Sequence, residues 1–368
     1  MFYNISKLEK KYEVKLDDTQ KEVLSSLTNF IEGNTQCICL RASAGTGKTL
    51  ILSILYDILK EEGIDCIFVA PTNKAKNVLV DKGDSNRICT TIHSLLNLRP
   101  NLNIMEFDAS QLCFEFAKVK QKESYHEVLL IDECSMINDE LYNTLVLKFH
   151  KSKIVFVGDS SQLKPIKQDK VSKTFQVQTL TLTKIYRQTE SKLYKVLNYL
   201  RSNPLYYFKE IHDDFCNITI CNNIVNMIEQ YSYLFKVGEN FKDFKLVKLI
   251  TYTNNRINAL NQLIRKNLYS NNNEYNIGEL LTGYDSCEYN SYMIKNSADY
   301  VVTYSHKCII IRFGLSLYAY TLTLEDTNNN KQNYVILSKY NSQEILNELA
   351  CVLEKLRQKA VKSKLSKD

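Results

Sequence analysis

A glycine-rich stretch near the N-terminus holds the residue types best suited to chemistry. Ala44-Gly45-Thr46-Gly47-Lys48-Thr49 follows a short apolar run and precedes a segment with helical character. This order is typical of a phosphate-binding loop, because the glycines turn successive N–H groups toward a phosphate and the helix N-terminus favours its charge. Lys48 is expected to reach the β- and γ-phosphates of a nucleoside triphosphate, and Thr49 to hold Mg²⁺. Ala42 replaces the first glycine of the consensus.

Two adjacent carboxylates supply a second part of the same chemistry. Asp132 and Glu133 end an apolar run, which is a weak signal alone and a specific one downstream of a phosphate-binding loop. We expect Asp132 to bind Mg²⁺, usually through water, and Glu133 to polarise the attacking water. Gln162 follows a further apolar run that ends in Gly158-Asp159. It could touch the γ-phosphate, or it could belong to an ordinary loop.

Short apolar runs separated by helical segments position these residues. The runs predict four buried strands, at residues 37–40, 66–70, 128–131 and 154–157. Alternation of short strands with helices predicts an α/β fold, with a parallel sheet that carries helices on both faces. A helix is expected from Leu16 to Gly33, with Asp17 or Asp18 as its cap and the glycine after its end.

The remaining chain departs from this pattern in two places. Residues 102–118 read as a β-hairpin that protrudes from the sheet domain, with strands at 103–107 and 112–116. From about Leu180 a second region is expected, so we predict domains at 1–182 and 183–368. The second holds a strand at 245–252, a helix at 255–269, antiparallel β-structure near 275–340 and a basic C-terminal helix at 341–364.

Composition excludes several classes of protein. No signal peptide and no run of 18 apolar residues is present, so a cytoplasmic location is expected. The 11 cysteines are scattered without a CxxC pair, which argues against a zinc site or a disulfide framework. The net charge of +6 permits an anionic partner without requiring one.

Six short motifs then follow one another in an order that resembles superfamily 1 DNA helicases of the Dda and RecD branch. They lie at residues 70–76, 91–96, 132–136, 158–165, 183–188 and 251–265, and the resemblance extends from Gln20 to about Leu337. It implies a RecA-like lobe that uses ATP and Mg²⁺ and a motor that moves on single-stranded DNA. It also implies a second RecA-like lobe with a small β-barrel inserted near 275–340, and a strand-separating pin at the hairpin.

The resemblance also assigns roles to individual residues. Gln20 would read adenine, although an ordinary surface glutamine is the alternative. Arg187 would be an arginine finger, against the alternative of a surface salt bridge. Five residues would contact the DNA backbone, and the first two of them could instead cap a helix: Thr72, Asn73, His93, Asn254 and Asn255.

One departure from the helicase pattern concerns the end of the chain. Two further motifs, one with a second arginine finger, are expected after the β-rich insertion and are not found; His306-Lys307 lacks the Gln-Gly continuation of the first. The second lobe is therefore expected to be incomplete. The gene product would be truncated, the chain shortened artificially, or the motor split, with a separate chain that carries the missing motifs.

Three functions stay open on these grounds. The first is an ATP-driven DNA helicase or translocase. The second is a non-catalytic remnant that binds ATP and single-stranded DNA. The third is another P-loop enzyme such as a GTPase, but Asn73-Lys74-Ala75-Lys76 lacks the aspartate of a guanine-reading element.

Overall fold

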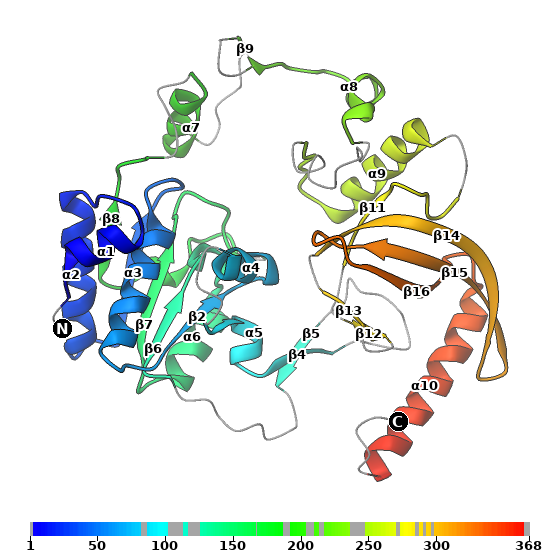
Figure 1. Ribbon diagram of the computed structural model, residues 1–368, viewed down its shortest axis with the longest axis horizontal. Coiled ribbons are helices and arrows are strands. Elements are labelled where there is room, and N and C mark those ends of the chain that lie inside the picture. Colours follow the sequence, from blue (N-terminus) through cyan, green and yellow to red (C-terminus); the bar gives the residue numbers. More distant parts are fainter. Residues whose placement is uncertain are drawn as a thin grey trace. The chain divides into compact units, whose positions relative to one another are not determined.

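A computed structural model describes most of the chain: residues 3–81, 87–101, 113–116, 126–166, 168–186, 192–203, 210–212, 217–235, 247–269, 273–283, 287–289, 292–295 and 298–363. These residues form two compact units (Figure 1), and we describe each by itself. The first unit contains the described residues up to Thr219, and the second those from Ile220 onward. This division lies later in the chain than the boundary expected between residues 182 and 183.

A six-stranded parallel sheet forms the centre of the first unit, in the order β3-β2-β6-β7-β1-β8. The strands are β1 (Cys37–Ala42), β2 (Cys66–Ala70), β3 (Cys89–Thr91), β6 (Val128–Ile131), β7 (Lys153–Gly158) and β8 (Thr179–Leu182). The predicted fold class is confirmed for this unit, since all of these pairings are parallel. The edge strand β8 was not predicted, and it extends the first sheet to the point where a second region was expected.

Helices cover both faces of this sheet, because alternate residues of each strand point to opposite sides. One core contains Ile38 and Leu40 of β1 together with apolar residues of α1 (Ile5–Lys11), α2 (Asp18–Glu32), α3 (Lys48–Glu61) and α4 (Asn73–Asp81). The other contains Cys39 together with residues of α5 (Ile92–Leu95) and α6 (Asp139–Lys148). The predicted cap of α2 is confirmed: Asp17 caps its start and Gly33 follows its end.

The segment expected to form a hairpin begins earlier than predicted. β4 (Leu98–Asn101) pairs antiparallel with β5 (Cys113–Phe116). Residues 102–112, which include the strand expected at 103–107, lie outside the described residues. Further along, the first unit also contains α7 (Lys192–Ser202) and a short antiparallel pair, β9 (Ile211–His212) with β10 (Asn217–Ile218).

The second unit is built on antiparallel β-structure. Its four-stranded sheet has the order β11-β14-β15-β16, from β11 (Leu280–Thr282), β14 (Asp299–Arg312), β15 (Leu315–Glu325) and β16 (Lys331–Leu337). Val302, Leu322 and Leu324 are buried in its core, and α10 (Gln343–Ser363) packs against β15. A second small core joins α8 (Ile224–Tyr231) and α9 (Asn254–Leu268). β12 (Cys287–Tyr289) pairs with β13 (Tyr292–Ile294).

The strand predicted at 245–252 is wrong over its described part. Residues 247–253 form neither helix nor strand, and Ile250 and Tyr252 are 90% and 97% exposed. A strand needs a partner for its N–H and C=O groups, and no described strand pairs with this segment. Within the described ranges, no helix is both long and apolar enough to cross a bilayer.

Candidate nucleotide-binding site

The loop between β1 and α3 has the backbone conformation that a phosphate-binding loop requires. Gly45 and Gly47 have φ angles of +85° and +89°, a region that residues with a Cβ rarely adopt. Gly47 is the N-cap of α3, and no side chain caps the helix there. The N–H groups of its first turn are thus oriented toward a site where an anion can bind.

Gln20 is part of the frame of this loop. It is 4% exposed, its Nε2 donates to the carbonyl of Thr46 at 3.2 Å, and its Oε1 accepts from the N–H of Asp17 at 3.2 Å. A Cβ on Gly47 would lie 2.8 Å from Gln20 Nε2. The alternative of an ordinary surface glutamine is therefore wrong: Gln20 fixes the start of α2 against the loop.

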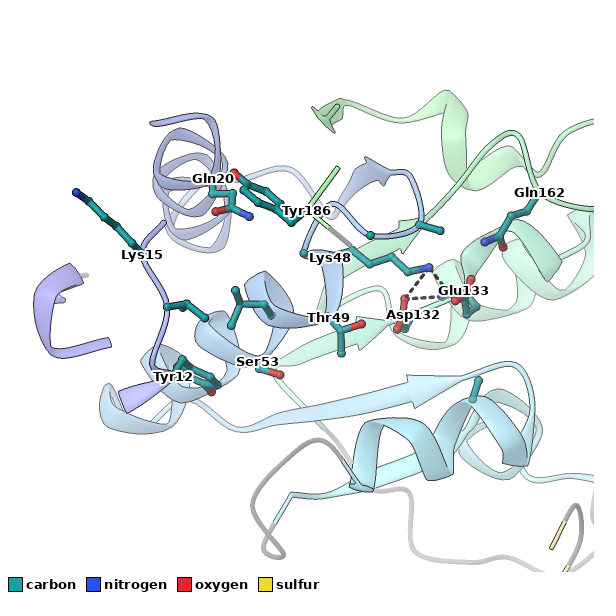
Figure 2. A pocket seen from close by; sticks show the side chains of 16 residues that line it. Tyr12, Lys15, Gln20, Lys48, Thr49, Ser53, Asp132, Glu133, Gln162 and Tyr186 are labelled. Carbon is teal, nitrogen blue, oxygen red and sulfur yellow. Dashed lines mark hydrogen bonds and ion pairs between the residues drawn. The ribbon is translucent and has the colours of Figure 1, made fainter. Parts of the chain in front are cut away.

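The charged residues of the site converge on one ammonium group (Figure 2). Lys48 Nζ lies 2.7 Å from Glu133 Oε1 and 3.9 Å from Asp132 Oδ1. Asp132 follows β6 and accepts from the N–H of Glu133 at 2.9 Å. Glu133 itself has φ +54°, an uncommon conformation for a residue with a side chain, which ends the strand abruptly and turns its carboxylate to Lys48. A phosphate that binds Lys48 has to compete with Glu133 for it.

The end of β7 forms a neighbouring turn. Asp159 is 4% exposed and accepts from the N–H and the hydroxyl of Ser161, at 3.0 and 2.6 Å. Its carbonyl accepts from the N–H of Gln162 at 3.1 Å, and Gln162 lines the cavity described below. Arg201 of α7 lies 3.8 Å from the same carboxylate, a contact that motif spacing did not indicate.

A cavity of about 970 Å³ joins these parts. It extends from Lys48 and Gln162 to a wall of side chains that the sequence did not identify, Tyr12, Lys15, Ser53 and Tyr186 (Figure 2). Of the predicted nucleotide-binding residues, all but Thr46 line it: Gln20, Ala44, Gly45, Gly47, Lys48 and Thr49. Thr46 is fully buried and acts through its carbonyl, which binds Gln20.

Two hydrogen-bond networks hold this wall in place. Arg87 donates to Ser53 Oγ at 2.8 Å and to the hydroxyl of Tyr12 at 2.9 Å, and that hydroxyl donates to Asp57 at 2.6 Å. The N–H of Tyr186 donates to the carbonyl of Gly45 at 2.8 Å, while its hydroxyl donates to Asp17. The bond from Tyr186, followed by that from the Gln20 N–H, holds the pKa of Asp17 below its usual value.

Comparison with known proteins agrees with this geometry. The family described as "AAA domain" matches residues 15–211, more than half of the chain. This chain belongs to the AAA domain family. Its matched part runs from Lys15 in the cavity wall, through the whole phosphate-binding loop and both carboxylates, to β9.

Curated relatives of this AAA domain protein include a DNA helicase. The ATP-dependent DNA helicase dda of Enterobacteria phage T4 is 23% identical over 279 residues, which cover 72% of this chain and 60% of that protein. The RecBCD enzyme subunit RecD of Buchnera aphidicola (subsp. Schizaphis graminum) is 30% identical over 183 residues, 44% of this chain and 28% of that protein. The chain is thus similar to helicases of the Dda and RecD type, as its motifs predicted, and it spans less than two thirds of their lengths.

Among solved structures, the Pif1 helicase from Candida albicans aligns with a TM-score of 0.40 and 16% identity, over 88% of this chain and 78% of that one. Pif1 from Bacteroides sp. aligns with the same TM-score and 17% identity, over 88% and 79%.

The donors expected for Mg²⁺ fit this ion. Thr49 and Asp132 both line the cavity of the AAA domain, and hydroxyl and carboxylate oxygens are the ligands that Mg²⁺ prefers. A single carboxylate beside a hydroxyl suits Mg²⁺, which usually binds through one or two carboxylates together with phosphates and waters.

The residues expected to contact DNA occupy two different settings. Thr72 and Asn73 follow β2, and His93 follows β3. All three therefore lie at the carboxyl ends of the parallel strands, the same end of the sheet at which Asp132 follows β6. Thr72 does cap a helix, since its Oγ1 accepts from the N–H of Ala75 at 3.2 Å. His93 is half-buried, and burial lowers its pKa.

The other two, Asn254 and Asn255, are exposed at the start of α9 in the second unit. Arg187, the expected arginine finger, lies outside the described residues.

Proposed function

We propose that this protein is an ATP-dependent motor on single-stranded DNA, in which ATP hydrolysis drives strand separation. The single observation that carries the proposal is the convergence of Lys48, Asp132 and Glu133 at a phosphate-binding loop. Similarity to a protein named an ATP-dependent DNA helicase supports the coupling to DNA.

The nucleotide would bind with its phosphates over the loop and its base toward the opposite wall. Backbone N–H groups of residues 45–49 and the ammonium of Lys48 would hold the β- and γ-phosphates. Thr49 and Asp132 would hold Mg²⁺, which when bound neutralises charge on the phosphate oxygens. Gln20 would read the adenine, with Lys15 and Tyr186 beside it.

Hydrolysis would depend on an exchange of partners at Lys48. As the γ-phosphate takes up the ammonium, Glu133 loses its counter-ion and becomes available to accept a proton from the attacking water. Gln162 would contact the γ-phosphate, and Arg187 would stabilise the charge that develops on it. The base is thus held neutralised until a phosphate is bound.

DNA would be held by its backbone, as a motor that tolerates any sequence requires. Thr72, Asn73 and His93 at the sheet edge of the first unit would supply contacts, and Asn254 and Asn255 of the second unit would supply others. The position of the first three supports this role, because they follow β2 and β3 at the same end of the parallel sheet at which Asp132 follows β6.

The test is phosphate release by the purified chain, with and without oligo(dT). We expect DNA to stimulate turnover, and Lys48→Ala to weaken ATP binding by about 1.5–3 kcal/mol, the range for hydrogen bonds to charged groups. Lys60→Ala is a matched control, since Lys60 lies on the same helix away from the cavity. Equal nucleotide affinity in wild type and Lys48→Ala would sink the proposal. Binding of both ligands without turnover would identify a non-catalytic ATP- and DNA-binding protein instead.

A further inference from the structure

The two longest strands of the second unit extend beyond their neighbours as a two-stranded ribbon (Figure 1). β11 pairs with β14 only at residues 299–301, and β16 pairs with β15 only at residues 319–325. At residues 309–318, here called the distal ribbon, neither strand therefore has a second partner among the described strands. From residue 304 onward, the outer edge of β14 leaves alternate N–H and C=O groups without a partner strand in the part of the chain that the structure describes.

One face of the distal ribbon continues the apolar core of the sheet as a surface exposed to solvent. On β15, Leu322 and Tyr320 of this face are buried, and Tyr318 is 46% exposed. Tyr318 pairs across the ribbon with Ile309, which is 63% exposed, and Ile311 on the same face is 69% exposed. On β15 the opposite face is covered, since Leu317 and Ala319 are 1% and 0% exposed and α10 packs on this strand.

The charge of this region has one sign. From Tyr300 to Leu324 the chain contains Lys307 and Arg312 and no Asp or Glu. Lys307 lies over the rings of Tyr318 and Tyr340, at 5.5 and 6.0 Å, and forms no ion pair with a described residue. Along β14 the two cations lie on either side of the isoleucines, and strand alternation places Lys307 on the face of the isoleucines and Arg312 on the opposite face.

We propose that the outer edge of β14, with Lys307, Ile309, Ile311 and Tyr318 on one face and Arg312 on the other, binds an extended protein segment with an apolar centre and acidic flanks. Such a segment would pair with the free edge of β14 as an added strand, so that its backbone satisfies the N–H and C=O groups there. Its apolar side chains would cover the isoleucines on one face. Because its side chains alternate between the faces, its carboxylates could meet Lys307 on that face and Arg312 on the other.

Two other occupants fit these observations less well. A second copy of the chain, paired edge to edge, would bring Lys307 and Arg312 of one copy against the same cations of the other, and like charges repel. A single-stranded nucleic acid would stack on Tyr318 and Tyr340, but it would leave Ile309 and Ile311 without an apolar partner. An acidic, apolar segment satisfies both the charge and the isoleucines.

The probe is a short fluorescein-labelled peptide in which valines are flanked at both ends by glutamate, titrated against the full chain by anisotropy. We expect saturable binding, and a loss of about tenfold or more in affinity for Ile311→Glu. Ile277→Glu is the matched control, because Ile277 is 63% exposed, close to the 69% of Ile311, and lies outside the ribbon. Lys307→Glu should weaken this peptide and favour a lysine-flanked version. Hydrogen exchange should slow at residues 303–312 when the peptide binds, and ATP turnover should be unchanged in each variant.

Each alternative result overturns the proposal. If the peptide does not bind saturably, or if the glutamate- and lysine-flanked peptides bind equally, an acidic protein segment is excluded as the ligand of this surface. Loss of oligo(dT) affinity in Ile311→Glu, without peptide binding in wild type, assigns the surface to nucleic acid. Dimerisation of wild type in sedimentation, abolished by Ile311→Glu, assigns it to a second copy. None of these outcomes depends on whether the first unit hydrolyses ATP.

Discussion

At the scale of single residues, the site is organised around the side chain of Lys48. Its ammonium is 2.7 Å from Glu133, and the Lys48 side chain is only 12% exposed, so solvent screens this pair less than a surface ion pair. Nucleotide affinity therefore includes the free energy needed to separate the pair. Glu133, which we propose as the base in hydrolysis, is thus also the residue with which a phosphate competes for Lys48.

This competition predicts the behaviour of Glu133→Gln. The neutral amide holds Lys48 less strongly, so we expect ATP to bind as tightly as in wild type or more tightly. Turnover should fall by about 10²–10⁴, the usual contribution of a general base. A fluorescent nucleotide titration and a phosphate-release assay measure the two effects separately. Weaker nucleotide binding in Glu133→Gln would contradict the competition.

The sequence predicted the charged residues of the site and missed most of its wall. The sequence patterns that contain Lys48, Asp132 and Glu133 are specific, because each pattern follows an apolar run that predicts a strand. Tyr12, Lys15 and Tyr186 lie in segments without periodicity. For Tyr12 and Lys15, nothing in the sequence indicates a position beside the loop. Tyr186 stands directly before Arg187, and this position in the fifth motif was the one available signal.

At the scale of elements, the phosphate-binding loop is held between α2 and α3. Gly47→Ala should lose stability for two reasons, the φ of +89° and a Cβ that would lie 2.8 Å from Gln20 Nε2. The first costs about 1–2 kcal/mol for a residue with a side chain. Gly63→Ala is a control for that cost, since its φ is +75° and nothing lies within 4 Å of its Cβ.

Chemical denaturation compares the two glycine variants. Gly47→Ala should lower the free energy of unfolding more than Gly63→Ala does, and it alone should weaken ATP binding. Equal losses in both variants, with nucleotide affinity intact, would show that the loop tolerates a side chain.

The cap of α2 predicts a dependence of stability on acid. Hydrogen bonds from Tyr186 and from the Gln20 N–H lower the pKa of Asp17 in the folded chain. Its contribution is therefore fully present above the ordinary value near 3.8 and is lost as the pH falls through the lowered pKa. We expect Asp17→Asn to be less stable at neutral pH and to show a shallower loss below about pH 4.

Thermal unfolding over that pH range tests this, with Asp18→Asn as the control. The control removes the same charge from the adjacent residue and leaves the cap of α2 intact. Parallel pH profiles in wild type and Asp17→Asn would show that Asp17 does not contribute to the pH dependence of stability.

Strands could be predicted where burial is complete on both faces. β2 and β6 are wholly buried, and their unbroken apolar runs gave their bounds as the structure has them. β8 alternates threonine with leucine at the edge of the sheet, and it was not predicted because no local signal tells which sheet a strand joins. The segment 247–253 contains strand-forming residues, but strand formation depends on a partner that the sequence does not specify.

At the scale of the whole molecule, the proposed DNA contacts come from both units. Affinity for oligo(dT) should fall as salt rises, with a log–log slope of about −0.7 for each phosphate contact. Fluorescence titrations between about 50 and 200 mM salt give the slope. An affinity that does not change over this range would argue against backbone contacts. Similar affinities for oligonucleotides of different sequence are expected for the same reason.

One feature of the first unit has a mechanical consequence. The chain leaves β8 and passes the phosphate-binding loop, where the N–H of Tyr186 is bonded to the carbonyl of Gly45 and its hydroxyl to Asp17. Tension applied to the chain after residue 186 therefore acts on the loop first, before it reaches the sheet. A pulling force on the chain after residue 186 would weaken the binding of a nucleotide at the loop. Force and nucleotide release would thus be coupled through Tyr186.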